Sequence, residues 1–566
     1  MAIIGIDLGT TNSLVSVYRD GKPVLIPNSF NSFLTPSVVS VDEDGTVWVG
    51  AVAREKRLIQ PERSISSFKR QMGTDQQFSL GKRNYTPQEL SALVLRKLKE
   101  DAEIFLGETV EEALISVPAY FNDEQRWATK EAGRLAGLKT ERLINEPSSA
   151  ALACRNQNDE NDSRFLVVDF GGGTLDVSVV ECFEQIIEIQ AVAGDNHLGG
   201  DDFDLRIAEY FCAEHKFPFV SLDKRQQALL LKRAEQCKQQ LTEGTAAMLE
   251  FSDGGNNLGM FITRPMLVEI SAVLFTRLKE VVMHALRDAG ITMKEIDRIV
   301  LAGGTCKMPV VRQYIAQTFG KEPVFAIEPD EIVAMGAGIY AGMKERCEEI
   351  RDIVLTDICP FTLGVGTVDS NNEKDLLMSP VIERNSVLPV SKIGYYVTVY
   401  DNETRLRMNV FQGESLRCSQ NLELGWLDIE VPPAPRGAEG VRVRFTYDIN
   451  GILQVDAENS RGESVSRVFL NKRVHMSEEE LERRMLELEH IKQNPREEEK
   501  NQLIFAKAER LYSECLGADR ATITALIRWY SEIMRGDSPA ALQAARSKAN
   551  ETLDYIEKKL GQPEES

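Results

Sequence analysis

The chain has 566 residues, of which 43% are hydrophobic, and this length predicts about three or four domains with ample apolar residues for their cores. The formal net charge of −21 argues against binding to nucleic acids or to anionic membranes, because both favour a basic face. No uninterrupted apolar span is long enough to cross a bilayer, and the N-terminus lacks a basic segment followed by a cleavage site.

The cysteines and histidines argue against a disulfide-linked or metal-binding class of protein. The nine cysteines form no Cys-x-x-Cys pair and their number is odd, which is typical of reduced packing cysteines rather than of a disulfide framework. The five histidines show no metal-ligand spacing. We therefore expect a cytoplasmic protein.

Two similar turns stand in the first part of the chain. Asp7-Leu8-Gly9-Thr10-Thr11 follows the apolar run 3–6, and Asp169 to Asp176 follow the apolar run 165–168. Each pattern predicts a strand that ends in a carboxylate, followed by a tight turn. Glycines let backbone N–H groups approach phosphate oxygens, threonine hydroxyls add donors, and aspartates can hold a hydrated Mg²⁺. One such turn is common in hairpins, but the pair favours a nucleotide clamp over two structural turns.

The first 350 or so residues mix helix and strand patterns and predict an α/β fold. Helical spacing predicts helices over 88–106 and 226–241, and a buried strand is expected over 297–301. That strand leads into Gly303-Gly304-Thr305, a third phosphate-type turn, and a helix should begin near Pro309. The run Gly336-Ala337-Gly338 fits a dinucleotide fingerprint poorly and instead predicts close helix packing.

The pattern changes after about residue 352. Apolar and polar residues alternate in short segments over 358–475, as over 405–410 and 441–447, which predicts an antiparallel β domain. The preceding segment Ile353-Val354-Leu355 is apolar and bounded by acids, which favours a docking segment over an ordinary strand.

The remainder is helical in pattern. Ser477 and Glu480 form a capping box, and further helices are expected to about residue 560, with breaks near 495, 517 and 536–539. Taken alone, this end of the chain is a plain helical bundle.

Together these stretches resemble the DnaK-type chaperones, the heat shock protein 70 family, over nearly the whole chain. The most specific are IGIDLGTTNS (4–13), VPAYFND (117–123), RLINEP (142–147), DFGGGTLD (169–176), the glycine- and aspartate-rich stretch 194–204, and EPDE (328–331). The short helical end and abbreviated first domain make the chain most similar to the HscC type of bacterial member.

The resemblance implies a multidomain architecture in three parts. Residues 1–352 would form a two-lobed, actin-like ATPase domain built from a duplicated ribonuclease H-like unit. A linker over 353–357 would join it to an antiparallel β-sandwich that binds peptides, 358–475. An α-helical lid would follow over 476–566.

The resemblance also implies ATP and ADP with Mg²⁺, and K⁺, as ligands. Catalysis is assigned to Lys69, Glu146, Asp169 and Thr174, and a water-mediated Mg²⁺ site to Asp7 and Asp169. Nucleotide contacts are expected from Thr10, Thr11, Asn12, Gly171, Gly172, Gly173, Thr174, Gly199, Gly200, Asp201, Glu235, Lys238, Thr242, Gly303, Gly304 and Asp330. Many members stack arginines on both faces of adenine, where this chain has Gln239 and Lys307.

The partners implied are unfolded or extended apolar polypeptide segments and a J-domain co-chaperone. The resemblance assigns peptide binding to Val365, Val368, Tyr396, Val399, Leu406 and Met408. Coupling between the domains falls on Pro118, Arg126, Ile353, Val354, Leu355 and Asp357, and J-domain contacts on Arg142, Asn145 and Asp357. The stretch 248–263 is shorter than the loop that the family's bacterial exchange factor grips, so dependence on that factor stays open.

Two other classes of protein are alternatives to an ATP-driven peptide chaperone. A small-molecule kinase on the same fold needs an acceptor pocket with a catalytic base, and gains nothing from a β domain on an apolar linker. A filament protein lacks the β and helical parts, and a scaffold without hydrolysis should lose residues such as Lys69 or Thr174. The sequence favours the chaperone.

Overall fold

The computed structural model describes residues 2–154, 163–183, 185–252, 257–351, 353–369, 372–449, 451–469, 483–485, 496–515, 517–534 and 539–560. The predicted capping box at Ser477 and Glu480 and the predicted boundary between 475 and 476 lie outside these residues. In the part of the chain that is described, none of the helices combines the length and the apolar composition that a bilayer span requires.

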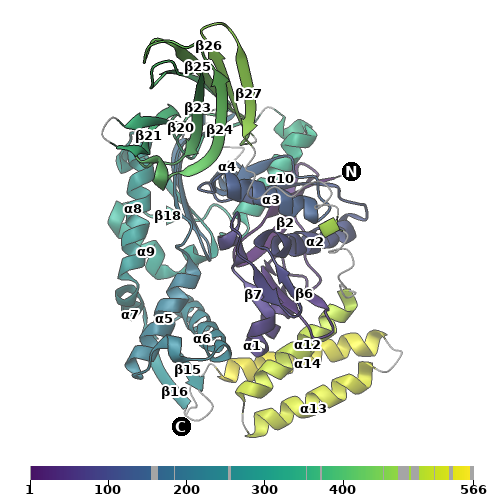
Figure 1. The fold of residues 1–566 in the computed structure, drawn as a ribbon. Coiled ribbons are helices and arrows are strands. Elements are labelled where there is room, and N and C mark those ends of the chain that lie inside the picture. The colour runs from purple at the N-terminus through teal and green to yellow at the C-terminus, as the bar shows by residue number, and fades with distance from the viewer. Residues whose placement is uncertain are drawn as a thin grey trace.

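Two six-stranded sheets form the cores of two lobes, and they repeat one strand pattern (Figure 1). The first has the order β11-β10-β1-β2-β3, with β4 paired to β2, and the second has the order β18-β17-β12-β13-β14-β19. In each, the first strand in sequence is parallel to one neighbour and antiparallel to the other. The bounds in the first lobe are β1 Ile3–Asp7, β2 Asn12–Arg19, β3 Lys22–Leu25, β4 Thr35–Pro36, β10 Glu112–Val117 and β11 Leu143–Asn145; in the second they are β12 Ser163–Phe170, β13 Leu175–Phe183, β14 Ile186–Asp195, β17 Arg298–Ala302 and β18 Pro323–Val324.

Helices cover these sheets and confirm the helical predictions to within two residues. The predicted helices appear as α2 (Pro87–Leu106), α6 (Lys224–Glu243) and α9 (Pro309–Phe319). The others are α1 Ala51–Ile59, α3 Asp123–Leu135, α4 Glu146–Cys154, α5 Gly200–Glu214, α7 Arg264–Ile270, α8 Ala272–Asp288 and α10 Ile332–Glu345. Smaller sheets are formed by β5 Val38–Val41, β6 Val47–Val49 and β7 Ser64–Ser66, by β8 Phe78–Leu80 and β9 Arg83–Tyr85, and by β15 Ala246–Ser252 and β16 Asn257–Thr263.

Helix α10 packs close to both β1 and α4, as its small residues predicted. A Cβ on Gly336 would lie 1.7 Å from the Ser149 carbonyl oxygen, and one on Gly5 would lie 2.3 Å from the backbone of Ala337. Any side chain at either position would push the helix away, so the glycines allow this close approach. The Gly-Ala-Gly run is therefore a packing motif.

The second part of the chain is a sandwich of two antiparallel sheets, ordered β21-β20-β23-β24 and β22-β25-β26-β27. The predicted alternation is confirmed: Leu406, Met408 and Val410 are buried while Arg405 and Arg407 are exposed. The bounds are β20 Leu363–Asp369, β21 Asn372–Ile382, β22 Val390–Val397, β23 Arg405–Gln412, β24 Leu422–Glu430, β25 Gly440–Tyr447, β26 Leu453–Asn459 and β27 Ser464–Phe469.

The apolar segment before the sandwich is both a strand and a docked segment. It forms β19 (Val354–Thr356), which extends the second sheet by pairing parallel with β14, so that Leu355 lies opposite Ile187. Ile353 and Leu355 pack against the buried cluster under that sheet, while Val354 is 49% exposed.

The sandwich itself rests on both lobes. Oδ1 of Asp123 in α3 accepts a hydrogen bond from the Tyr447 hydroxyl at 3.0 Å, and the backbone N–H of Asp123 donates to Gln412 Oε1 at 3.2 Å. On the other lobe, Asp288 at the end of α8 accepts from Arg384 at 2.8 Å. The linker and the sandwich are thus docked on the first part of the chain as one continuous contact.

The helical end comprises α12 (Arg496–Glu514), α13 (Gly517–Met534) and α14 (Pro539–Leu560), with breaks where they were predicted. The three helices share an apolar core built around Leu511, Tyr530 and Leu553. In Figure 1 they lie beside α1 of the first lobe, far from the sandwich, and α12 contacts α1 directly.

Candidate functional site

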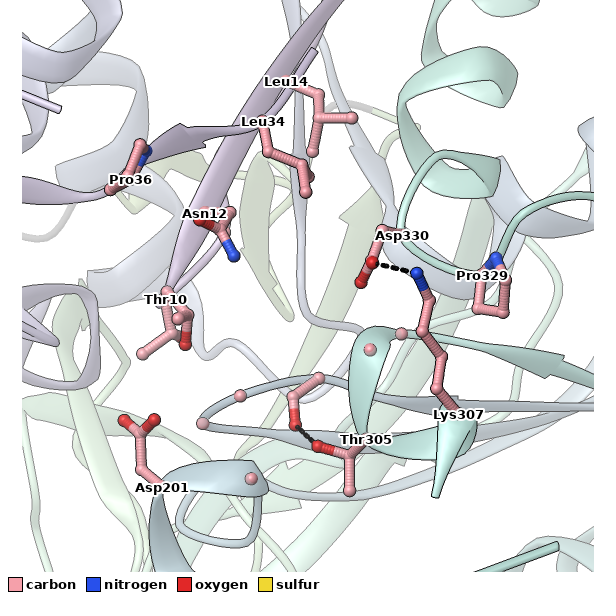
Figure 2. Close-up of a pocket in the computed structure, with 18 of the residues that line it drawn as sticks. Thr10, Asn12, Leu14, Leu34, Pro36, Asp201, Thr305, Lys307, Pro329 and Asp330 are labelled. Carbon is pink, nitrogen blue, oxygen red and sulfur yellow. Dashed lines mark hydrogen bonds and ion pairs between the residues drawn. The ribbon is translucent and has the colours of Figure 1, made fainter. Parts of the chain in front are cut away.

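The three glycine–threonine turns line one cavity of about 640 Å³ between the lobes. Figure 2 shows Thr10 and Asn12 on one side of it, and Lys307 and Asp330 on the other. The residues predicted from the sequence that line this cavity are Asp7, Thr10, Thr11, Asn12, Lys69, Glu146, Asp169, Gly171, Gly172, Gly173, Thr174, Gly200, Asp201, Glu235, Lys238, Thr242, Gly303, Gly304 and Asp330. Gly199 lies just behind it, where a Cβ would stand 2.3 Å from the Gly172 carbonyl oxygen.

The turns approach each other so closely that side chains are excluded. A Cβ on Gly172 would stand 1.9 Å from Thr11 Oγ1 of the opposite lobe. Gly303 has a φ of 79°, and a Cβ there would stand 2.4 Å from the Phe170 carbonyl oxygen. The Thr11 hydroxyl is buried without a hydrogen-bond partner among the described residues. Backbone N–H groups and an available hydroxyl facing one cavity fit the oxygens of a phosphate chain.

Lys69 and Glu146 form the central ion pair of the site. Lys69 Nζ donates to Glu146 Oε1 at 2.7 Å, and the two residues are only 4% and 7% exposed. Lys69 comes from the short helix Phe68–Gln71 and Glu146 from the start of α4. The pair holds a cation and a carboxylate at the bottom of the cavity, where an ammonium group could offset phosphate charge and a carboxylate could accept a proton.

Three aspartates stand close to this pair: Asp7 and Asp169 line the cavity, and Asp176 is 1% exposed beside them. Burial, and next the charge of Glu146, raises the pKa of Asp7 to about 7, that of Asp176 to about 8, and that of Asp169 well above its usual range. Asp7 Oδ1 accepts a hydrogen bond from Ser116 at 2.8 Å. A divalent cation held among these carboxylates would relieve their repulsion, so the donor set fits Mg²⁺.

The wall of the cavity formed by the second lobe holds further polar contacts, and some of their residues were not predicted from the sequence. Lys238 Nζ donates to Asp204 Oδ2 at 2.8 Å and to the Gly200 carbonyl at 2.9 Å. The Ser67 hydroxyl donates to Asp201 Oδ2 across the two lobes at 3.0 Å. Asp204 is the last residue of the glycine- and aspartate-rich stretch 194–204, so the sequence motif could have indicated it. Ser67 stands two residues before Lys69 but carries no motif of its own.

Gln239 and Lys307 both line the cavity, and neither is free to act as a planar arginine would. Lys307 pairs with Asp330 at 2.6 Å and with Glu328, while Gln239 Nε2 is 3.4 Å from Glu235 Oε1. Neither side chain offers a guanidinium plane on which adenine could stack, so we expect an adenine nucleotide to bind here more weakly, and to exchange faster, than with two arginines.

We expect the double variant Gln239→Arg/Lys307→Arg to release a fluorescent adenine nucleotide about five- to thirtyfold more slowly, since each added stack contributes about 0.5–1 kcal/mol or more. Stopped-flow displacement by unlabelled nucleotide measures this rate. The variant Arg225→Lys, an exposed change on the same α6, is the control. An off-rate equal to that of wild type would remove this explanation.

The residues predicted to line a peptide cleft divide into two groups. Val365, Leu406 and Met408 are buried in the sandwich core, at 2%, 7% and 1% exposure. Val368, Val399 and Tyr396 are partly exposed, and the Tyr396 hydroxyl lies 3.4 Å from Ser379 Oγ of the facing sheet. In this conformation the first group packs the sandwich, as alternating aliphatic residues commonly do.

Two of the predicted coupling residues, Arg126 and Asp357, are joined through Asn145, a predicted partner contact, in one hydrogen-bonded chain. Arg126 donates to Asn145 Oδ1 at 2.6 Å, and Asn145 Nδ2 donates to Asp357 Oδ2 at 2.8 Å. Arg126 also donates to the Ala119 carbonyl at 3.0 Å, and the backbone N–H of Ala119 donates to Oδ1 of Asp176, the buried member of the aspartate group, at 3.0 Å. A continuous polar path therefore runs from the carboxylate cluster to the residue that follows the docked linker strand.

The other predicted switch and partner residues flank this path. The carbonyl of Pro118 accepts a hydrogen bond from the Phe121 N–H at 3.1 Å, in the turn that leads into α3. Arg142 lies beside Tyr340 of α10 and hydrogen-bonds to it. Burial raises the pKa of Asp357. The hydrogen bonds that its carboxylate accepts from the Ile358 N–H and from Asn145 partly offset this rise.

A protein-family model described as "Hsp70 protein" matches the chain over residues 3–80 and 75–560. The match spans the two lobes, the linker strand, the sandwich and nearly all of the helical end.

Proposed function

The chain belongs to the Hsp70 family, and from this we propose that ATP hydrolysis between the two lobes switches a peptide site in the β-sandwich between open and closed states. Members of this family are ATP-dependent chaperones that bind ATP or ADP with Mg²⁺ and unfolded polypeptide in general. We propose the ATPase, linker, sandwich and lid boundaries 1–352, 353–357, 358–475 and 476–566, a cytoplasmic protein of the HscC type, and K⁺ as a further ion.

In the proposed reaction, Lys69 and Glu146 carry the chemistry at the bottom of the cavity. The Lys69 ammonium would neutralise charge that develops on the terminal phosphate, and Glu146, 2.7 Å away, would orient the attacking water together with Thr174. Bound Mg²⁺ would supply further positive charge, held through water by Asp7 and Asp169. The glycine–threonine turns of the two lobes would hold the phosphate chain from either side.

The observation that carries the coupling proposal is the hydrogen-bonded path from Asp176 through Ala119, Arg126 and Asn145 to Asp357. A change of charge in the cavity on loss of the terminal phosphate would alter the first contact and bias the linker strand at the other end of the path. Two arrangements of one docked element, selected by a bound phosphate, are a common form of molecular switch.

A J-domain co-chaperone is proposed to act at the same junction, through Arg142, Asn145 and Asp357. Asn145 and Asp357 bond to each other when the linker is docked, so a partner at this point would sense the linker directly. The experiment that tests the function as a whole is release of a labelled apolar peptide in the presence of ATP and of ADP. Faster release with ATP supports the proposal, and equal release contradicts it.

A further inference from the structure

Helix α12 of the helical end reaches the mouth of the nucleotide cavity. Leu503, midway along this helix, is one of the residues that line the cavity, together with Phe30 and Ala51 of the first lobe. Leu503 and Phe30 also pack on the apolar cluster around Trp48. A residue more than 400 positions away from Phe30 in the sequence thus completes a wall of the pocket.

Buried polar contacts fix α12 to the first lobe on both sides of Leu503. Towards the start of the helix, Glu499 accepts hydrogen bonds from Lys97 Nζ at 2.8 Å and from the Ser29 hydroxyl at 2.9 Å. Towards its end, Arg510 Nε donates to Glu55 Oε2 of α1 at 2.6 Å, and Arg510 is 2% exposed.

The same helix is also bonded to the second lobe. Glu514 accepts from Arg510 at 3.1 Å and pairs with Arg233 of α6. Helix α6 supplies Glu235, Lys238 and Thr242 to the cavity. The chain of contacts Glu55–Arg510–Glu514–Arg233, here named the α12 bridge, therefore links α1 of the first lobe to α6 of the second, two helices that lie side by side in Figure 1.

The contacts of the α12 bridge should form together and break together. Its charged groups are nearly excluded from water: Arg233 and Glu514 side chains are 13% and 5% exposed. Removing one member leaves a buried charge without its partner, which costs more than the pair contributes. Partial opening is therefore disfavoured, and departure of the helix removes this link between the lobes, so that contacts such as Ser67–Asp201 and Arg70–Asp202 hold them alone.

We propose that α12 is a third wall of the nucleotide pocket, which retains nucleotide while the helical end is docked and opens the exit when it leaves. This inference rests on the proposed function, because it takes the cavity to be the ATP site. The helical end then acts on the bound nucleotide from the docked position seen here, and its departure opens one wall of the pocket.

The test compares release of a non-hydrolysable fluorescent ATP analogue from full-length variants, chased with unlabelled ATP. Arg233→Gln removes the contact to the second lobe, and Leu503→Ala removes the wall. Each should speed release about fivefold or more, the usual size of coupling between linked sites. Arg225→Gln makes the same charge change on an exposed position of α6 and should release at the wild-type rate.

The outcomes separate this inference from the proposed function. If the wild-type chain binds no ATP analogue, the proposed function fails. If it binds the analogue but Arg233→Gln and Leu503→Ala release it at the wild-type rate, the ATP site stands and the third wall is wrong. A second readout is amide hydrogen exchange over 496–514 in the wild-type chain, which should slow when the analogue is added; unchanged exchange would also overturn the inference.

Discussion

The variant Lys69→Met should hydrolyse bound ATP about 10²–10⁴-fold more slowly than the wild-type chain in a single turnover. In the wild-type chain the Lys69 ammonium group is 4% exposed and 2.7 Å from Glu146, near three aspartates whose pKa values are raised by burial and by the charge of Glu146. No other lysine stands among the predicted phosphate-side residues of the cavity. Without it, the site loses the one side-chain cation assigned to the charge that develops on the terminal phosphate, beside the Glu146 carboxylate.

ATP binding should persist in this variant, because the glycine–threonine turns and the α6 contacts remain. Filter binding of labelled ATP establishes this before quenched-flow hydrolysis is measured. The variant Lys82→Met removes an exposed lysine from the same lobe and should behave as wild type. Hydrolysis at the wild-type rate in Lys69→Met, with ATP bound, would exclude the role assigned to this residue.

The second large effect is expected at the linker. Leu355→Asp should keep basal ATP hydrolysis and lose its stimulation by an apolar peptide and by a J-domain protein. Leu355 is partly buried against the cluster under the second sheet, and a carboxylate there would lose part of its hydration without gaining a partner, at a cost of about 1–3 kcal/mol. The linker strand would then separate from β14. The hydrogen-bonded path that ends at Asp357 could then no longer change the docking of that strand.

The neighbouring residue provides a matched control. Val354 belongs to the same three-residue strand but is 49% exposed, so Val354→Asp adds the same charge while leaving the docked face intact. It should retain most of the stimulation, measured as steady-state phosphate release with and without peptide. Full stimulation in Leu355→Asp would show that the docked strand does not transmit the signal.

Local patterns predicted much of this architecture. The two aspartate-led turns after apolar runs indicated that opposite strands would meet over a phosphate, and the structure brings Thr11 and Gly172 within contact of each other. Period-two alternation located the sandwich, and an apolar segment bounded by acids located the docked linker. Each of these signals is contained within about ten residues, where backbone geometry and burial leave a direct mark on sequence.

What could not be predicted depends on contacts between distant surfaces. Arg233 and Glu514 are 281 positions apart, and each taken alone looks like an ordinary charged residue on a helix. Leu503 stands next to the apolar stripe that packs within the helical end (Ile504, Ala508 and Leu511), so nothing in the sequence marks it as part of a pocket in another domain. Alternation likewise could not separate residues that pack a sandwich from residues that line a groove in it, as Val365 and Met408 illustrate.

The most direct measurement is the dissociation rate of a fluorescent apolar peptide from the full-length chain, with ATP in one experiment and ADP in the other. Docking of linker and sandwich on the two lobes under control of the terminal phosphate predicts rapid escape with ATP and slow escape with ADP, and the Leu355→Asp chain should show no such difference. If the peptide leaves the wild-type chain at one rate with either nucleotide, the two halves are not coupled and the account is wrong.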